Sequence, residues 1–520
     1  MKRVLVTFLA LGAVWAAGAA LAATTVTLNV VQIFNTIDPA KVTDYTGYMA
    51  AVNLYDGLVT VDKNGAIQPL LASSWEASPD ATTYTFHLRP NATFHDGSPV
   101  TAADVVYSVK RLLAIDQGPS YLFKGVLGPD SVTASDPHTV VFHLQKVFSP
   151  FLATVPLIFV VNSKVVQANA TNGDWGQAYV ADHDAGSGPY TLAGWTRGSE
   201  MRLKRYDNYM LGWGKGPIDN LRFVVTNDEA TVRSLAASGE LTMTSEFQAN
   251  ETYAALAKMP RFRVVSQPTG TAFYFKMNTQ VAPTDDVHVR KAIACATDYQ
   301  TIRNSIYPGA PLAGPLPAVF KNDYLTTLKD PTFDMSCAKS ELAQSKYAGK
   351  GAIPLTFSYV SGASFEEEIG LLMKSNLEKI GFKVTLAPEP WNRITEIASK
   401  ASTTPNVTEV FFGATYASPD SMFFTQYDTK AQGTWSSMEW LGNAEVDKMI
   451  TDARATTDPA QQAAIYKKLQ QTIVDLQPDV FVLVQNVRHA MDKCLTGYNY
   501  VPVQSFDYNF HNYSWTCATN

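Results

Sequence analysis

Apolar and polar residues alternate in several short stretches of this chain, and this period of two predicts half-buried strands. The stretches are residues 26–30, 83–88, 355–359 and 382–386. Residues 273–278 are also strongly β-prone, and residues 480–484 form an apolar run that predicts a buried strand. Strands are therefore expected in six short stretches between residues 26 and 484.

Apolar residues recur at helical spacing in other stretches. Residues 366–380 predict an amphipathic helix that Gly381 ends, and residues 459–476 predict a helix whose N-cap is Asp458. A third helix is expected after Thr101, because Thr101 and Asp104 fit a capping box. The helix at 366–380 lies between two predicted strands, so this unit is expected to be a right-handed βαβ unit with parallel strands.

Composition and charge are those of a globular protein of two or three domains. The chain has 520 residues, of which 46% are hydrophobic, 17% charged and 11% aromatic. The formal net charge is −6, and no basic stripe is visible. These features argue against nucleic acid as a partner, and the generous aromatic content suits a protein that holds ligands against rings.

The N-terminus predicts export. Lys2 and Arg3 precede an apolar run at residues 4–19, and Ala20-Leu21-Ala22 is a small-x-small cleavage site. We therefore expect residues 1–22 to be a signal peptide that is cleaved near Ala22. The alternative is an uncleaved membrane anchor, since the run is nearly long enough to span a bilayer. No cysteine near the cleavage site could carry a lipid, which favours a freely diffusing periplasmic protein.

The four cysteines predict two disulfides, because an exported protein with an even number of cysteines commonly pairs them all. Of the three possible pairings we favour Cys295–Cys337 with Cys494–Cys517, which closes the shorter loops. The chain has no CxxC motif and its eight histidines are scattered. We therefore expect no cofactor and no metal site built from protein ligands alone, and a metal carried by an organic chelator stays open.

The most specific pattern lies between Ser74 and Lys110. It consists of Ser74-Trp75-Glu76, His87-Leu88-Arg89, Phe94-His95-Asp96-Gly97 and the run TAADVVYS at 101–108. This order of residue types resembles a segment of the extracellular solute-binding proteins that feed peptide, nickel and related ABC importers. The resemblance extends to Asp38-Pro39 and to Gly186-Ser187-Gly188-Pro189-Tyr190. We expect the residues of the 74–110 pattern to build the fold and not to bind ligand.

The resemblance implies an α/β fold of the periplasmic-binding-protein type, with two lobes, a cleft between them and an extra domain on the first lobe. Residues 24–56, 184–270 and 489–520 would form lobe I, residues 57–183 the extra domain and residues 271–488 lobe II. The chain crossings near residues 270 and 488 would be the hinges for closure.

The function that the resemblance implies is that of a periplasmic receptor, not an enzyme. It would capture a small solute, such as a peptide, an oligosaccharide or a related compound, and deliver it as a monomer to a membrane ABC permease. A ligand sensor or a chaperone on the same fold is an alternative. A secreted hydrolase is less favoured, because nucleophile and metalloprotease motifs are missing and the acidic run Glu366-Glu367-Glu368 is typical of a solvated helix face.

One loop bears on specificity. In peptide-binding relatives it reads approximately Trp-x-Ala-Asp-Tyr-x-x-Pro, and its Asp pairs with the α-ammonium of the peptide. Aligned without gaps, Phe412 stands for the Trp and Thr415 for the Asp, whereas Tyr416 and Pro419 match. Threonine offers no charge to offset a buried ammonium, although Asp420 could substitute. A neutral polar ligand or an anionic ligand therefore stands beside a peptide as an equal alternative.

Further ligand-binding candidates are residues predicted near the cleft, for which ordinary packing is the alternative. They are Phe34, Asn35, Trp391, Trp435 and Trp440. Arg393 could pair with a ligand carboxylate, and its alternative is a solvated surface charge.

Overall fold

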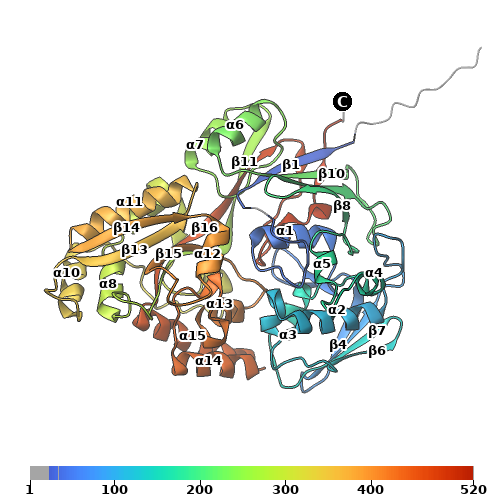
Figure 1. Cartoon of the computed structure of the whole chain (residues 1–520), viewed down its shortest axis with the longest axis horizontal. Helices are drawn as coiled ribbons and strands as arrows, with labels where there is room; N and C mark the ends of the chain where they lie inside the picture. Colours follow the sequence, from blue (N-terminus) through green and yellow to red (C-terminus); the bar gives the residue numbers. More distant parts are fainter. Residues whose placement is uncertain (1–22, 33, 519–520) are drawn as a thin grey trace, which may run out of the picture.

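The computed structural model describes residues 23–32 and 34–518, and three main sheets organise this part of the chain (Figure 1). A four-stranded sheet lies at the upper right of the figure, a six-stranded sheet at the left and a second four-stranded sheet at the lower right. The predicted signal peptide, residues 1–22, lies outside the described residues. In the described part, no helix is long and apolar enough to cross a membrane.

The first sheet begins with the predicted N-terminal strand and has the order β1-β10-β9-β8. Its strands are β1 (Thr25–Val30), β10 (Asn220–Val225), β9 (Glu200–Arg205) and β8 (Tyr190–Thr196). The β1 and β10 strands are parallel, and the other pairs are antiparallel. Helix α1 (Tyr45–Leu54), which is buried along its whole length, lies below this sheet in Figure 1.

The second sheet has the order β12-β16-β11-β15-β13-β14. Its strands are β12 (Gly309–Pro311), β16 (Asp479–Asp492), β11 (Phe262–Met277), β15 (Val407–Phe412), β13 (Ile353–Val360) and β14 (Phe382–Glu389). The helices of this half are α8 (Val287–Cys295), α9 (Tyr299–Thr301), α10 (Met335–Gln344), α11 (Ser364–Glu378), α12 (Trp391–Ile397), α13 (Pro419–Tyr427), α14 (Ala444–Ala455) and α15 (Pro459–Leu476). The predicted βαβ unit is β13-α11-β14, and its strands are parallel.

The third sheet has the order β4-β5-β7-β6, and its first two strands contain the beginning of the 74–110 pattern. Its strands are β4 (Ala72–Ala77), β5 (Thr83–Leu88), β7 (Thr139–His143) and β6 (Val132–Asp136), and a small ribbon of β2 (Val59–Val61) and β3 (Ile67–Pro69) precedes it. The helices here are α2 (Ala102–Ile115), α3 (Phe151–Thr154), α4 (Ser163–Ala168) and α5 (Gln177–Val180). The predicted capping box begins α2, because the Asp104 carboxylate accepts the backbone N–H of Thr101 at 2.9 Å.

Two long strands connect the halves of the molecule. The β11 and β16 strands pair antiparallel from Phe262–Asp492 to Lys276–Asp479, with a register shift between Pro268 and Ala272. Figure 1 shows both strands extending from the second sheet up to α6 (Glu229–Ala237) and α7 (Asn250–Ala257), and α7 contacts both of them.

Both predicted disulfides are confirmed. Cys295, at the end of α8, pairs with Cys337 of α10, and their Cα atoms are 5.9 Å apart. Cys494 pairs with Cys517 with a Cα separation of 5.3 Å. The second bridge flanks a two-stranded ribbon of β17 (Leu495–Thr496) and β18 (Ser514–Trp515), so it ties the C-terminal segment to the end of β16.

Candidate functional site

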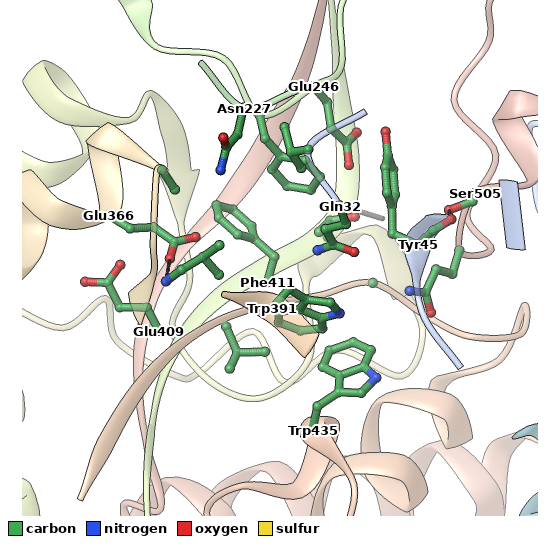
Figure 2. A pocket seen from close by; sticks show the side chains of 18 of the residues that line it. Gln32, Tyr45, Asn227, Glu246, Glu366, Trp391, Glu409, Phe411, Trp435 and Ser505 are labelled. Carbon is green, nitrogen blue, oxygen red and sulfur yellow. Dashed lines mark hydrogen bonds between the residues drawn. The ribbon is translucent and has the colours of Figure 1, made fainter. Parts of the chain in front are cut away.

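A cavity lies between the two halves of the molecule, and we call it the central cavity (Figure 2). One wall comes from residues 31–32, 45, 227 and 246–247 and from several residues between 500 and 508. The other wall comes from residues 360–366, 391, 409–413 and 435. The space free of atoms is about 1060 Å³, the solvent at the mouth included. A cavity between two halves of a protein is a common place for a small ligand to bind.

Two of the predicted aromatic residues line this cavity. Trp391 is the first residue of α12, and its ring centroid is 5.2 Å from that of Trp435 at an interplanar angle of 66°. Figure 2 shows the two indoles together at one side of the cavity. The indole N–H of Trp435 donates to the Thr43 carbonyl oxygen at 3.2 Å. Trp435 therefore also links the second half of the molecule to the first.

A row of rings crosses the central cavity from wall to wall. The Phe247 ring on the first wall lies 5.4 Å from Tyr45 and 5.7 Å from Phe411 on the opposite wall, measured between centroids. The Tyr45 hydroxyl donates to the Tyr508 hydroxyl at 2.6 Å, which fixes the direction of the Tyr45 ring. The middle of the cavity is thus aromatic, with tyrosine hydroxyls toward the first wall.

The second wall carries two buried carboxyl groups, Glu366 and Glu409. Glu366 lies in the first turn of α11, and its carboxylate accepts the backbone N–H of Val360 at 2.7 Å. Burial raises the pKa of Glu366 to about 8. Glu409 lies in β15 and is 0% exposed. Burial, followed by the nearby Glu366 carboxylate, holds the pKa of Glu409 well above its ordinary value.

The first wall carries a second pair of carboxyl groups, Glu246 and Asp507. Asp507 accepts a hydrogen bond from the Tyr498 hydroxyl at 3.1 Å, and burial raises its pKa to about 7. Burial and then repulsion from Asp507 raise the pKa of Glu246 well above its ordinary value. On each wall, therefore, one carboxyl group disfavours the ionisation of the other: Glu366 that of Glu409, and Asp507 that of Glu246.

The central cavity offers these carboxyl groups no cationic side chain. Its described lining contains no lysine, arginine or histidine. Arg488 donates to Asn250 at 2.7 Å and stacks over the Tyr253 ring at 4.4 Å, and it does not line the cavity. In the part of the chain that the structure describes, no group of three or more His, Cys, Asp or Glu side chains is placed to hold a metal ion. The chemistry of the cavity is thus acidic and aromatic.

The loop that was predicted to set specificity lines a second cavity. Phe412 and Thr415 lie there with Tyr121 and Lys124, and Trp435 borders both cavities. Tyr416 is fully buried, and its hydroxyl donates to Asp420 at 2.6 Å. Neither Tyr416 nor Asp420 lines either cavity.

Asp420 is 0% exposed and 3.3 Å from the Arg454 guanidinium. The Asp420 carboxylate therefore already has a cationic partner inside the protein. Its position does not support the idea that Asp420 replaces the acid that peptide-binding relatives have at position 415.

The remaining predicted candidates lie outside the central cavity. The Phe34 ring packs on Phe223 at 5.7 Å, and Asn35 is exposed. Trp440 donates its indole N–H to Thr404 at 2.9 Å. Arg393 pairs with Glu396 at 2.7 Å, one helical turn further along α12, with nearly half of its side chain exposed. Arg393 thus lies at the surface, and Phe34 and Trp440 are packed against other residues, so their positions agree with the alternatives to ligand binding.

Sequence reasoning missed the four carboxyl groups. The prediction of a solvated acidic face was wrong for Glu366, which is 4% exposed, although Glu367 and Glu368 are exposed as expected. Glu409 did leave a signal, because it is a lone acid between Val407 and Phe412 in an otherwise apolar and threonine-containing strand. A charge in such a strand is expensive to bury and needs an explanation. Glu246 lies in a loop and Asp507 in the short 3-10 helix Phe506–Tyr508, and their sequence neighbours carry no comparable signal.

Three residues of the family-like motifs make contacts inside the protein. The His95 ring contacts the Asp184 carboxylate at 2.8 Å and the Gly188 carbonyl oxygen at 2.9 Å. A Cβ on Gly188 would lie 2.6 Å from the Asn53 carbonyl oxygen, so this turn needs glycine to pack against the end of α1. Asp38 of the Asp38-Pro39 loop is fully buried and bonded to Arg111.

Comparison with known proteins agrees with this architecture. The chain is 29% identical over 488 residues, 92% of each chain, to the probable D,D-dipeptide-binding periplasmic protein DdpA of Escherichia coli (strain K12). Among solved structures, DppA of Helicobacter pylori in complex with the peptide STSA aligns with a TM-score of 0.85 at 21% identity, over 95% of this chain and 98% of that one. AgaA of A. tumefaciens R10 in complex with agropinic acid aligns with a TM-score of 0.82 at 26% identity, over 94% of this chain and 98% of that one.

The predicted α/β, two-lobed fold is confirmed by these alignments. The model of the bacterial extracellular solute-binding proteins, family 5 Middle, matches residues 66–434, which is most of the chain. Relatives at this level of identity are described as binding proteins. The chain belongs to the bacterial extracellular solute-binding proteins of family 5, the solute receptors of ABC importers.

Proposed function

We propose that this protein captures a small, peptide-related solute in the central cavity and hands it, chemically unchanged, to the permease of an ABC importer. The observation that supports this most is the central cavity itself, which is lined from both halves of the molecule. The names of the relatives mention D,D-dipeptides, the peptide STSA and agropinic acid, which supports a solute of peptide size.

Closure of the two lobes is the proposed mechanism. Because both walls contribute contacts, a ligand gains its full set of contacts only when the lobes come together, and it therefore favours the closed form. We place the hinges in β11 and β16 near residues 270 and 488, where the register shift between Pro268 and Ala272 supports a change of strand direction. Lobe I would comprise residues 24–56, 184–270 and 489–520, the extra domain residues 57–183 and lobe II residues 271–488.

Trp391 and Trp435 are the proposed direct contacts among the predicted aromatic residues, since both line the central cavity. Phe412 and Thr415 would contact only a ligand that extends past Trp435 into the second cavity. The other predicted candidates are proposed to serve in packing or at the surface, as their positions support. They are Phe34, Asn35, Arg393, Tyr416, Asp420 and Trp440.

The proposed location is the periplasm, after removal of residues 1–22 near Ala22, with the mature chain acting as a monomer. Two disulfides support an oxidising compartment, because cytosolic thiols are kept reduced. The periplasmic description of the relative DdpA agrees with this location.

Native purification and ligand release test the proposed function. The mature protein is purified without refolding and denatured, and the released small molecules are identified by mass spectrometry. The unloaded protein is then titrated with that compound and with a panel of dipeptides, tripeptides and oligosaccharides. We expect a rise in melting temperature and a change in tryptophan emission with at least one compound. A panel that produces neither change, together with no released ligand, would overturn the receptor function.

A further inference from the structure

The central cavity holds four carboxyl groups and, among its described lining residues, no cationic side chain. Glu366 and Glu409 lie on one wall and Glu246 and Asp507 on the other. Buried carboxylates are normally paired with cations, because an isolated buried charge is strongly unfavourable. A partner from outside the chain would remove this cost.

Glu409 points most directly to such a partner. It lines the cavity and is 0% exposed, and neither of its carboxylate oxygens has a hydrogen-bond partner among the described residues. Glu366, in contrast, satisfies one oxygen with the Val360 N–H at 2.7 Å. A buried carboxyl group with no partner on either oxygen requires an explanation, and at the wall of a cavity a bound ligand supplies one.

The surface between the two carboxyl pairs is aromatic. Figure 2 shows Phe411 between the Glu366–Glu409 pair and Glu246, with Trp391 below it. The Phe247 and Phe411 rings, one from each wall, are 5.7 Å apart. Such a surface suits methylene groups and also attracts cations to the ring faces. The cavity is therefore complementary to a molecule with an apolar middle and polar, cationic ends.

We propose that the ligand is a compact organic dication, with one ammonium or guanidinium group for the Glu366–Glu409 pair and one for the Glu246–Asp507 pair. This inference rests on the proposed receptor function and names its substrate class. It replaces the expectation from Thr415 that a neutral or anionic ligand is an equal alternative, because Thr415 does not line the central cavity. A basic dipeptide and an aliphatic diamine share the required chemistry.

Calorimetric titration of the unloaded mature protein tests the proposal. The panel contains lysyl-lysine, cadaverine, alanyl-alanine and glutamyl-glutamate, so that the first two arms distinguish a peptide source from a diamine source. We expect one or both dications to bind at least about tenfold more tightly than the neutral and acidic peptides. Glu409→Gln should weaken the dication about tenfold or more while leaving the neutral peptide within about twofold.

The control variant is Glu367→Gln, which removes an exposed acid next to Glu366 and should leave binding unchanged. If Glu409→Gln does not fold, Glu246→Gln on the opposite wall tests the same charge. Tighter binding of a neutral or acidic peptide than of both dications would overturn this inference and leave the receptor function intact. Equal affinity of Glu409→Gln and the unchanged protein for the dication would also overturn it. Binding of no compound from this panel or the broader one would overturn both.

Discussion

Replacing Glu366 with glutamine should stabilise the unloaded protein at alkaline pH, and the reason is the burial of this carboxyl group. Burial raises its pKa from 4.5 to about 8, so the folded chain holds this proton more tightly than the unfolded chain. Between these two pH values the unfolded chain loses the proton first, and the free energy of unfolding falls as pH rises. The contribution is intact below about pH 4.5 and lost by about pH 8. Glutamine keeps an oxygen for the Val360 N–H and cannot ionise.

The size of the effect follows from the two pKa values. The difference between 4.5 and about 8 corresponds to an upper limit of about 4 to 5 kcal/mol, at about 1.4 kcal/mol per pKa unit. Solvent that reaches the cavity raises the effective dielectric constant and lowers this cost. We therefore expect Glu366→Gln to gain about 2 to 4 kcal/mol over the unchanged protein at pH 8 and less than about 1 kcal/mol at pH 5.

Urea unfolding of the unloaded protein at several pH values between 5 and 8 measures this difference. The Glu367→Gln variant serves as the control, because Glu367 is exposed and its replacement should leave the pH dependence unchanged. The reasoning is refuted if the stability difference between Glu366→Gln and the unchanged protein does not grow from pH 5 to pH 8.

Three further outcomes are expected. Arg111 binds both carboxylate oxygens of Asp38, at 2.7 and 2.6 Å. Arg111→Ala should therefore lower the free energy of unfolding in urea by about 3 to 5 kcal/mol, because it leaves Asp38 as a lone buried charge. A loss below about 1 kcal/mol would contradict this. Serine at both Cys494 and Cys517 should cost about 3 kcal/mol, since the bridge closes a loop with a sequence separation of 23 residues; equal unfolding midpoints with and without reductant would count against it. Trp435→Phe should remove much of the ligand-induced change in tryptophan emission, since Trp435 borders both cavities; an unaltered change would assign the signal to other tryptophans.

Local elements were predictable because the residues that specify them are neighbours in sequence. The capping box of Thr101 and Asp104 begins α2 as expected, and Asp458 caps α15 by accepting the Gln461 N–H at 2.8 Å. The βαβ unit followed from the period of its apolar residues, because a half-buried strand and an amphipathic helix must each present one apolar face. The disulfide pairing was one of three possibilities and needed the structure to confirm it.

The second wall of the central cavity was not predictable in the same way. Glu366, Glu367 and Glu368 are consecutive acids of one helix, yet only Glu366 turns toward the interior, where β13 supplies a backbone N–H. Arg393 and Trp391 are two residues apart on α12, and one pairs with Glu396 at the surface while the other lines the cavity. Which face of a helix lines a cavity depends on the elements that the helix packs against, and the sequence of the helix alone does not specify those elements.

The sequence by itself determined the family, the α/β class and the positions of several strands and helix caps, because these depend on the order of residue types and on contacts between near neighbours. Only the tertiary structure decided the chemistry of the cavity. Glu246, Glu366, Glu409 and Asp507 come from four distant segments, and they form one acidic site only because the two halves fold toward each other across β11 and β16. The absence of cations from the described lining around them is a property of that arrangement, and the proposed dication ligand rests on it.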